Sequence, residues 1–196
     1  MTDLTVVILT KNEEKNLRKC IESFRGTVKR FVIVDSFSTD GTEKLCHQLD
    51  EELRKKGSSL DFYQNKWVSY ADQLNWGLQN GIDTEWSMRM DADEEIMEDL
   101  AKEIDEKLPK VKEPVNGIIL RRRVYFMGRW IKHGGRYPEL LLRIFRTGKA
   151  ACEMKIMDEH MILSEGTTIE FKHDLIDNNP VSYTHLRAHE TLMNLV

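Results

Sequence analysis

Short apolar runs recur through the first half of the chain and alternate with segments that carry a helical repeat. Residues 5–9 and 31–34 are continuous β-branched or aromatic runs, which are typical of strands buried on both faces. Residues 60–63 and 86–91 supply a third and a fourth candidate strand, the last with Trp86, Met88 and Met90 at alternating positions. This strand–helix order predicts a parallel sheet with helices on both faces.

The segments between these strands place apolar residues three or four positions apart, which is the spacing of one helix face. We predict that Thr10 and Asn12 cap the first helix and that Gly57, Gly81 and Pro109 end the next three. The expected inward positions are Leu17, Cys20, Ile21 and Phe24, then Leu45, Cys46, Leu49 and Leu53, then Tyr70, Ala71, Leu74 and Leu78, and finally Ile96, Leu100, Ile104 and Leu108.

The pattern changes beyond Pro114. Residues 115–120, 139–145 and 167–171 have strand-like patterns, and no strong helical repeat separates them. We therefore expect the second half of the chain to add mixed or antiparallel strands and loops to the parallel sheet.

The composition narrows the class of protein. A chain of 196 residues with 40% hydrophobic and 32% charged residues fits one globular domain. The formal net charge of -4 argues against a nucleic-acid partner, which needs a basic face. No apolar stretch approaches the roughly 18 residues of a membrane span, and the first residues lack an apolar signal core. We expect Cys20, Cys46 and Cys152 to be buried free thiols of a cytoplasmic protein.

Three polar clusters follow predicted strands, at residues 10–14, 35–42 and 91–94. In open α/β sheets, ligands bind outside the carboxyl ends of the strands, so these clusters are candidates for a common site. Taken singly, each cluster also suits an ordinary turn, helix cap or acidic loop. Neither a G-x-G-x-x-G nor a Walker pattern is present, which argues against a dinucleotide or P-loop enzyme.

The strings at residues 6–13, 32–42 and 91–94 together resemble family 2 glycosyltransferases. Residues 128–138 and 142–145 are most similar to a branch related to lipopolysaccharide-core glucosyltransferases. The resemblance covers about residues 4–179 and implies a GT-A fold, which is a Rossmann-like three-layer α/β/α arrangement. It also implies that a sugar is transferred from a nucleotide-sugar, with a UDP-sugar favoured, by an inverting and metal-dependent reaction. The acceptor would be a glycan or a lipid-linked molecule in cell-envelope polysaccharide or lipopolysaccharide biosynthesis.

The resemblance assigns the donor side of the site to the first two clusters, and a basic run adds a candidate on physical grounds. Thr10, Asn12 and Glu13 would line the base and ribose pocket, and Asp35 would accept a hydrogen bond from the base. Among Arg121, Arg122 and Arg123, strand alternation puts the first and third on one face, and Arg121 is our candidate for the diphosphate.

Asp91 and Asp93 form the Asp-X-Asp motif of this resemblance. Asp91 would face the ribose or the metal, and Asp93 would bind the divalent cation that bridges the diphosphate. Carboxylate oxygens suit Mg²⁺ or Mn²⁺, which bind through one or two carboxylates together with phosphate oxygens.

The acceptor side is assigned to two later segments. Asp158 and Glu159 are the candidates for the base that deprotonates the acceptor hydroxyl, and the choice between them stays open because many family members have the reverse order. Trp130, Arg136 and Tyr137 are the candidates for contacting the acceptor sugar. Two other functions stay open: a truncated, non-catalytic nucleotide-sugar-binding fragment, and a GT-A nucleotidyltransferase, whose N-terminal glycine-rich loop is absent.

The last residues have a different origin in our interpretation. Residues 180–191 resemble a translated sequencing adapter, so we expect residues 1–179 to be a truncated GT-A catalytic domain and residues 180–196 a non-native tail. A peripheral contact with the inner face of the plasma membrane would suit a lipid-linked acceptor. No amphipathic helix before residue 180 points to such a contact.

Overall fold

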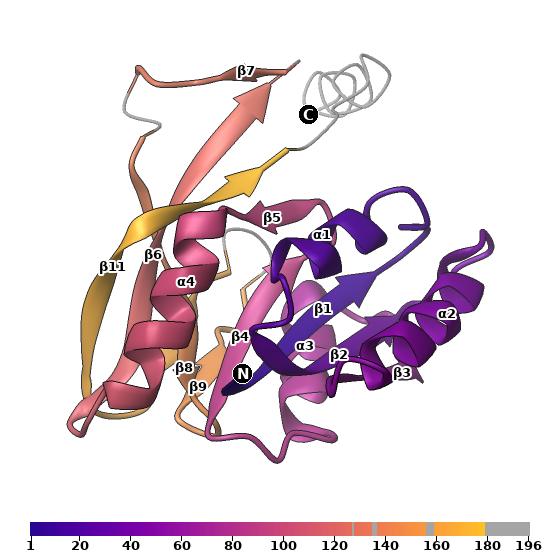
Figure 1. Cartoon of the computed structure of the whole chain (residues 1–196), viewed down its shortest axis with the longest axis horizontal. Helices are drawn as coiled ribbons and strands as arrows, with labels where there is room; N and C mark the ends of the chain where they lie inside the picture. The colour runs from indigo at the N-terminus through magenta and orange to yellow at the C-terminus, as the bar shows by residue number, and fades with distance from the viewer. Residues whose placement is uncertain (127, 135–136, 156–158, 179–196) are drawn as a thin grey trace.

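The computed structural model describes residues 1–126, 128–134, 137–155 and 159–178. Its central sheet has the strand order β3-β2-β1-β4-β8-β6-β11-β5, with β7 paired to β6 (Figure 1). The four strands of the first half are β1 (Thr2–Thr10), β2 (Val28–Asp35), β3 (Ser59–Gln64) and β4 (Trp86–Asp91). They are mutually parallel, which confirms the predicted βα alternation.

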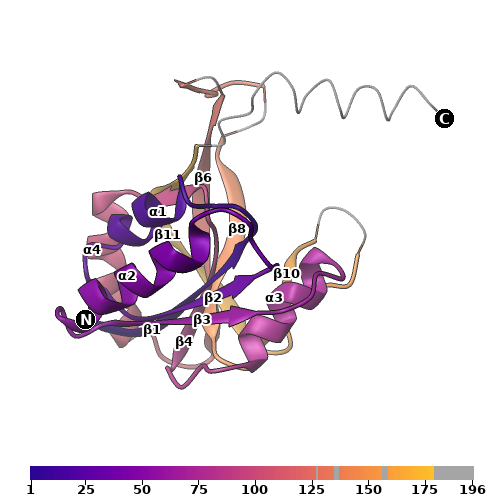
Figure 2. The same ribbon diagram turned by 90° about the vertical axis from the view of Figure 1, so that its right-hand side faces the viewer.

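Helices cover both faces of this parallel half (Figure 2). Leu4, Val6 and Ile8 of β1 face a core that also contains the buried residues of α1, α2 and α4. Val7 faces the opposite core with Ala71 and Leu74 of α3. The helices are α1 (Leu17–Ser23), α2 (Thr42–Arg54), α3 (Tyr70–Gln79), α4 (Glu98–Lys107) and the short 3-10 helix η1 (Leu108–Lys110).

The second half adds mixed strands to the same sheet, as the sequence predicts. β8 is antiparallel to both β4 and β6, β11 is parallel to β6, and β5 is antiparallel to β11. β9 and β10 form a separate two-stranded sheet. These elements are β5 (Glu94–Ile96), β6 (Val115–Phe126), β7 (Arg129–Trp130), β8 (Glu139–Arg146), β9 (Ala150–Cys152), β10 (Met161–Leu163) and β11 (Thr167–Asp177).

Two local predictions are wrong. Ile96 belongs to β5 and not to a helix, because it pairs with Leu175 of β11, and α4 begins only at Glu98. Its side chain still joins the core that contains Leu100 and Ile104, which explains why the spacing suggested a helical position. The N-cap of α1 is Asn16. The Thr10 side chain instead bonds to Asp35 at the end of β2, and the Asn12 side chain bonds to Thr39 in the loop that follows.

Other sequence predictions are confirmed. Cys20, Cys46 and Cys152 are buried and free. Gly57 and Gly81 follow the ends of α2 and α3 with φ angles of 84° and 76°, which favour glycine. Within the described ranges, no helix is both long and apolar enough to cross a membrane.

Candidate functional site

The first two polar clusters meet where the parallel strands β1 and β2 end. Thr10 and Asp35 are register partners, and the Thr10 hydroxyl donates to Asp35 Oδ1 over 2.9 Å. Asp35 is fully buried, and its Oδ2 accepts the backbone N–H of Ser38 at 2.7 Å. The Ser38 hydroxyl also donates to the Asp35 carboxylate. Asp35 is therefore fixed at the end of its strand by hydrogen bonds to both carboxylate oxygens.

Asn12 braces the loop after β1 against the loop after β2. Its backbone has a φ of 59°, a left-handed conformation that asparagine tolerates better than most residues. Its N–H donates to Ser38 Oγ, and its Oδ1 accepts the N–H of Thr39, each at 2.8 Å. The neighbouring Glu13 N–H donates to Thr42 Oγ1 at 2.9 Å. The two loops thus form one preorganised edge that contains Thr10, Asn12, Glu13 and Asp35.

Asp91 ends β4 beside this edge and is held by donors. Tyr70 donates to Asp91 Oδ1 at 2.6 Å, while Arg89 and Arg143 approach Oδ2 at 3.8 and 3.6 Å. Burial alone would raise the pKa of Asp91, but Arg143, Arg89 and the Tyr70 hydroxyl outweigh it and lower the pKa below the usual value. Asp91 is therefore an ionised carboxylate already compensated by the protein.

A buried ion pair supports the turn that carries Asp91. Arg143 Nη2 of β8 donates to Glu94 Oε1 at 2.6 Å, and these side chains are only 2% and 1% exposed. Glu94 Oε2 accepts the backbone N–H of Asp91 at 3.0 Å. Burial opposes the charge on both partners: Glu94 and Asp91 still raise the pKa of Arg143 above its usual value, whereas for Glu94 burial outweighs Arg143 and raises its pKa to about 7. The pair therefore links β8 to the turn between β4 and β5.

Asp93 differs from Asp91 because it has no ion-pair partner among the residues that the structure describes. Burial, together with the negative charges of Asp177, Asp91 and Glu13, raises its pKa to about 6. The structure lacks a ready-made cluster of three or more acidic, histidine or cysteine ligands within its described ranges. An uncompensated carboxylate next to other carboxylates fits a hard divalent cation that takes its remaining ligands from phosphate and water.

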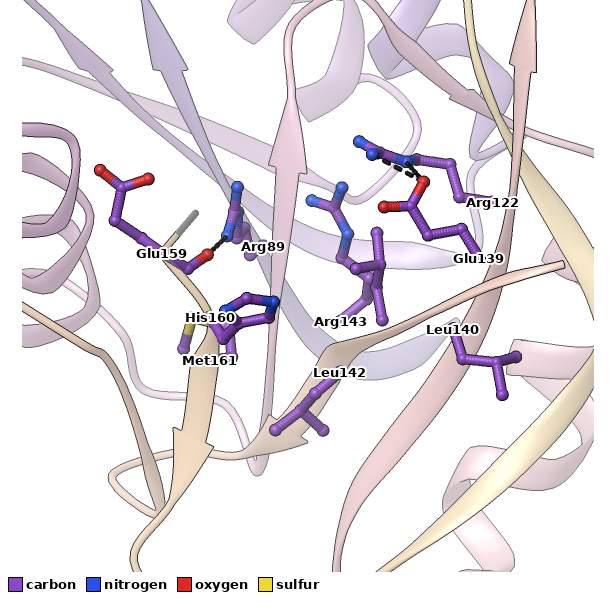
Figure 3. A pocket seen from close by; sticks show the side chains of 10 residues that line it. Arg89, Arg122, Glu139, Leu140, Leu142, Arg143, Glu159, His160 and Met161 are labelled. Carbon is purple, nitrogen blue, oxygen red and sulfur yellow. Dashed lines mark hydrogen bonds and ion pairs between the residues drawn. The ribbon is translucent and has the colours of Figure 1, made fainter. Parts of the chain in front are cut away.

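A pocket of about 460 Å³ lies between β4, β8, the end of β6 and the segment before β10 (Figure 3). Arg89, Arg122 and Arg143 come from three different strands and line it together. Among the described residues, Arg89 Nε and Arg143 Nε and Nη1 are buried and make no hydrogen bond, although Arg143 Nη1 lies 3.6 Å from Asp91 Oδ2. Because three guanidinium groups line the pocket, it suits a ligand with oxygen acceptors or negative charge.

Glu159 reaches the same pocket from the other side. Its backbone carbonyl accepts a long hydrogen bond of 3.4 Å from Arg89 Nη1, whereas its carboxylate points away from that guanidinium (Figure 3). Glu159 also lines a neighbouring hollow with Trp67, Tyr70 and Met154. Asp158, the other candidate base, lies outside the described residues.

The three arginines of the basic run each pair with acids of neighbouring strands. Arg121 and Arg123 pair with Glu170 and Asp174 of β11, whereas Arg122 pairs with Glu139 of β8 and also with Asp177 of β11. Arg122 also lies 3.7 Å from Glu94 Oε1 and lines the pocket. Arg121 is not among the residues of that pocket, so its role at the diphosphate stays a prediction.

Trp130 and Tyr137 lie together at the end of β6, away from β1. Their rings meet edge to face with centroids 5.1 Å apart. The Arg123 guanidinium and the Lys132 ammonium lie 4.3 and 4.5 Å from the Trp130 ring centroid. Tyr137 donates to Asp174 at 3.0 Å. The third acceptor candidate, Arg136, lies outside the described residues.

Sequence reasoning did not assign roles to Tyr70, Arg89, Glu94 and Arg143. The signal for Arg143 was a lone charge inside the apolar run at residues 140–145, and Arg89 occupied a polar position two residues before the Asp-X-Asp motif. A charge at such a position needs a partner when the strand is buried. That partner, Glu94, is 49 residues away in sequence, and only the folded chain identifies it.

Comparison with known proteins agrees with this architecture. Residues 5–164 match the family described as "Glycosyl transferase family 2". The chain is 32% identical over 163 residues to the lipopolysaccharide core biosynthesis glycosyltransferase LpsC of Rhizobium meliloti. This match covers 83% of the chain but only 58% of LpsC, so the chain spans less than two thirds of that relative.

Solved structures show the same fold at low sequence identity. The S. aureus TarS structure in complex with UDP-GlcNAc has a TM-score of 0.57 and 18% identity, and the match covers 93% of this chain and 60% of that one. The mannosyltransferase PcManGT from Pyrobaculum calidifontis, in complex with GDP-Man and Mn²⁺, has a TM-score of 0.50 and 22% identity, covering 62% of this chain and 36% of that one. The GT-A-like α/β fold predicted from the sequence is thereby confirmed.

Proposed function

This chain belongs to glycosyltransferase family 2, and we propose that it transfers a hexose from a nucleotide-sugar, with a UDP-sugar favoured, to a glycan or lipid-linked acceptor with inversion. The observation that carries this proposal is the convergence of Asp35 and Asp91 at one edge of the sheet, with Asp93 in the turn that follows. Thr10 pairs with Asp35 and Leu9 pairs with Asp91 across the same parallel strands, and Asp93 comes two residues after Asp91. The similarity to LpsC supports a place in lipopolysaccharide-core or related polysaccharide synthesis.

The nucleotide occupies the edge formed by the loops after β1 and β2 in this proposal. Asp35 retains acceptor capacity, because each carboxylate oxygen has two lone pairs, and it accepts a hydrogen bond from the base. Asn12 and Glu13 line the base and ribose side. UDP-GlcNAc and GDP-Man are bound by TarS and PcManGT, respectively, and these complexes support a nucleotide-sugar as the ligand of this fold.

Asp93, assisted by Asp91, would hold Mg²⁺ or Mn²⁺. Asp93 suits this role better than Asp91, because Asp91 already faces Tyr70, Arg89 and Arg143. A bound divalent cation would offset the negative charge that develops on the departing nucleoside diphosphate. The guanidinium groups of Arg89 and Arg143, which line the pocket, orient the transferred sugar or the diphosphate.

Either Asp158 or Glu159 deprotonates the acceptor hydroxyl. Glu159 is at the rim shared by the pocket and the hollow beside Trp67, so an acceptor that enters there meets its carboxylate. Comparing Glu159→Gln and Asp158→Asn separates the two assignments, because only the variant that lacks the base loses turnover while keeping donor binding.

Calorimetric titration of UDP-glucose into the chain, with and without Mn²⁺, tests the proposed donor site. We expect binding that requires the metal and is lost in Asp93→Asn, while the matched control Asp99→Asn, an exposed acid in the first turn of α4, binds as the wild type does. Equal binding by both variants would remove Asp93 from the metal site.

Two other functions make different predictions. A non-catalytic nucleotide-sugar-binding fragment binds the donor but turns over no acceptor, and the partial coverage of LpsC favours testing for it. A nucleotidyltransferase would release diphosphate from UTP and a sugar phosphate. Donor turnover in the presence of a glycan acceptor, without consumption of UTP, distinguishes the proposed transferase from both.

A further inference from the structure

The end of β6 and β7 project past the helices that cover the sheet (Figure 1). β7 pairs with β6 through Tyr125 with Trp130 and Phe126 with Arg129, which makes a hairpin. We call the described residues 121–126 and 128–134 the basic hairpin. Its position leaves the side chains near Arg129 accessible, because Phe126, Gly128 and Arg129 are exposed.

The basic hairpin contains no acidic residue. Residues 121–138 include five arginines, one lysine and one histidine, and neither aspartate nor glutamate, in a chain whose net charge is -4. The arginines nearest the sheet are neutralised by acids on β8 and β11. In the part of the hairpin that the structure describes, Arg129 and Lys132 have no ion-pair partner. The projecting end is therefore cationic on a protein that is anionic elsewhere.

Aromatic side chains accompany these cations. Phe126 is 38% exposed and pairs across the hairpin with Arg129. Trp130 is the next residue, with the Lys132 ammonium 4.5 Å from its ring centroid. Aromatic rings beside lysine and arginine suit the boundary between water and lipid, where the rings enter the headgroup region and the cations meet phosphate.

We propose that the basic hairpin is the surface by which this protein rests on an anionic phospholipid membrane. Charge complementarity selects the partner, because the unpaired cations lie at one projecting end. Arg122 of the same hairpin lines the candidate pocket, so a hairpin seated on a membrane holds that pocket close to the lipid surface. The contact does not depend on catalysis, and its failure would leave the proposed donor site untouched.

Sedimentation of the 196-residue chain with vesicles tests the proposal. We expect binding to phosphatidylcholine vesicles that contain phosphatidylglycerol, no binding to pure phosphatidylcholine, and release as salt is raised. Each cation near an anionic surface strengthens binding by about fivefold, so Arg129→Gln with Lys132→Gln should weaken it by roughly 25-fold. Phe126→Ser should weaken it further without changing the charge.

The matched control is Lys55→Gln with Lys56→Gln, which removes the same charge from exposed positions after α2. All variants retain residues 180–196, so any affinity of that segment cancels from the comparison. A melting temperature equal to that of the wild type shows that each variant is folded.

Three results would overturn the proposal: equal binding to neutral vesicles, equal loss in the control, or wild-type binding by the hairpin variant. The proposal would also be overturned if the chain bound no vesicles but bound a phosphorylated oligosaccharide through Arg129 and Lys132. That result would assign the basic hairpin to acceptor binding.

Discussion

The buried pair of Glu94 and Arg143 gives the sharpest test of how this site is built. Arg143→Met keeps most of the side-chain volume and removes the guanidinium. Glu94 is then left 1% exposed with Arg122, 3.7 Å away, as its nearest remaining cation. Breaking a buried ion pair by removing one partner costs about 3–5 kcal/mol. We therefore expect a loss of that size in the free energy of unfolding.

The reciprocal change, Glu94→Gln, should cost less. The amide keeps an oxygen for Arg143 or for the Asp91 N–H, and Asp91 Oδ2 lies 3.6 Å from Arg143 as a second anion. Losing a charged hydrogen bond on this scale costs about 1.5–3 kcal/mol. The double variant should be more stable than the sum of the two losses predicts, because no uncompensated charge then remains at this position.

Urea unfolding followed by circular dichroism measures these losses, and Mn²⁺ titration followed by electron paramagnetic resonance reports the geometry of the Asp91–Asp93 turn. Glu98→Gln is the control, because the Glu98–Lys102 pair is half exposed or more on both sides and solvent screening leaves it little effect on stability. If Arg143→Met unfolds at the same urea concentration as this control, with unchanged Mn²⁺ affinity, the buried pair does not support the turn.

Three further predictions concern the frame of the site. Thr10→Val removes the hydroxyl that donates to buried Asp35 and should cost about 1–3 kcal/mol; urea unfolding checks this, and a neutral result would contradict the bond. Gly77→Ala places a methyl group 2.8 and 2.9 Å from valines of β2 and β1 and should cost about 1–3 kcal/mol by overpacking, which a lower melting temperature would report. Burial alone would raise the pKa of Glu103, but Lys107, the N–H groups of Lys172 and His173 and the His173 ring lower it below 4.5. The ionised Glu103 carboxylate therefore stabilises the folded state fully above pH 4.5, and this contribution is lost as the pH falls through the lowered pKa. The difference in the free energy of unfolding between the wild type and Glu103→Gln should therefore shrink in acid. A constant difference across that pH range would refute the assignment.

The sequence by itself determined the parallel half of the sheet and the edge that carries the candidate site. β1 to β4 are specified by short apolar runs, and Thr10, Asp35 and Asp91 each end such a run, so local pattern was enough to place them. Parallel strands bring their carboxyl ends to the same edge, which is why three separate polar clusters could be predicted to meet.

Only the tertiary structure decided which charges meet. The chain pattern did not reveal that Arg143 pairs with Glu94, or that Arg122 and not Arg121 lines the pocket. It also misassigned Ile96, whose strand conformation comes from pairing with Leu175, 79 residues further along. These features depend on which strands become neighbours in the mixed half of the sheet. A charge in a buried strand shows that a partner is needed, whereas long-range pairing selects the partner.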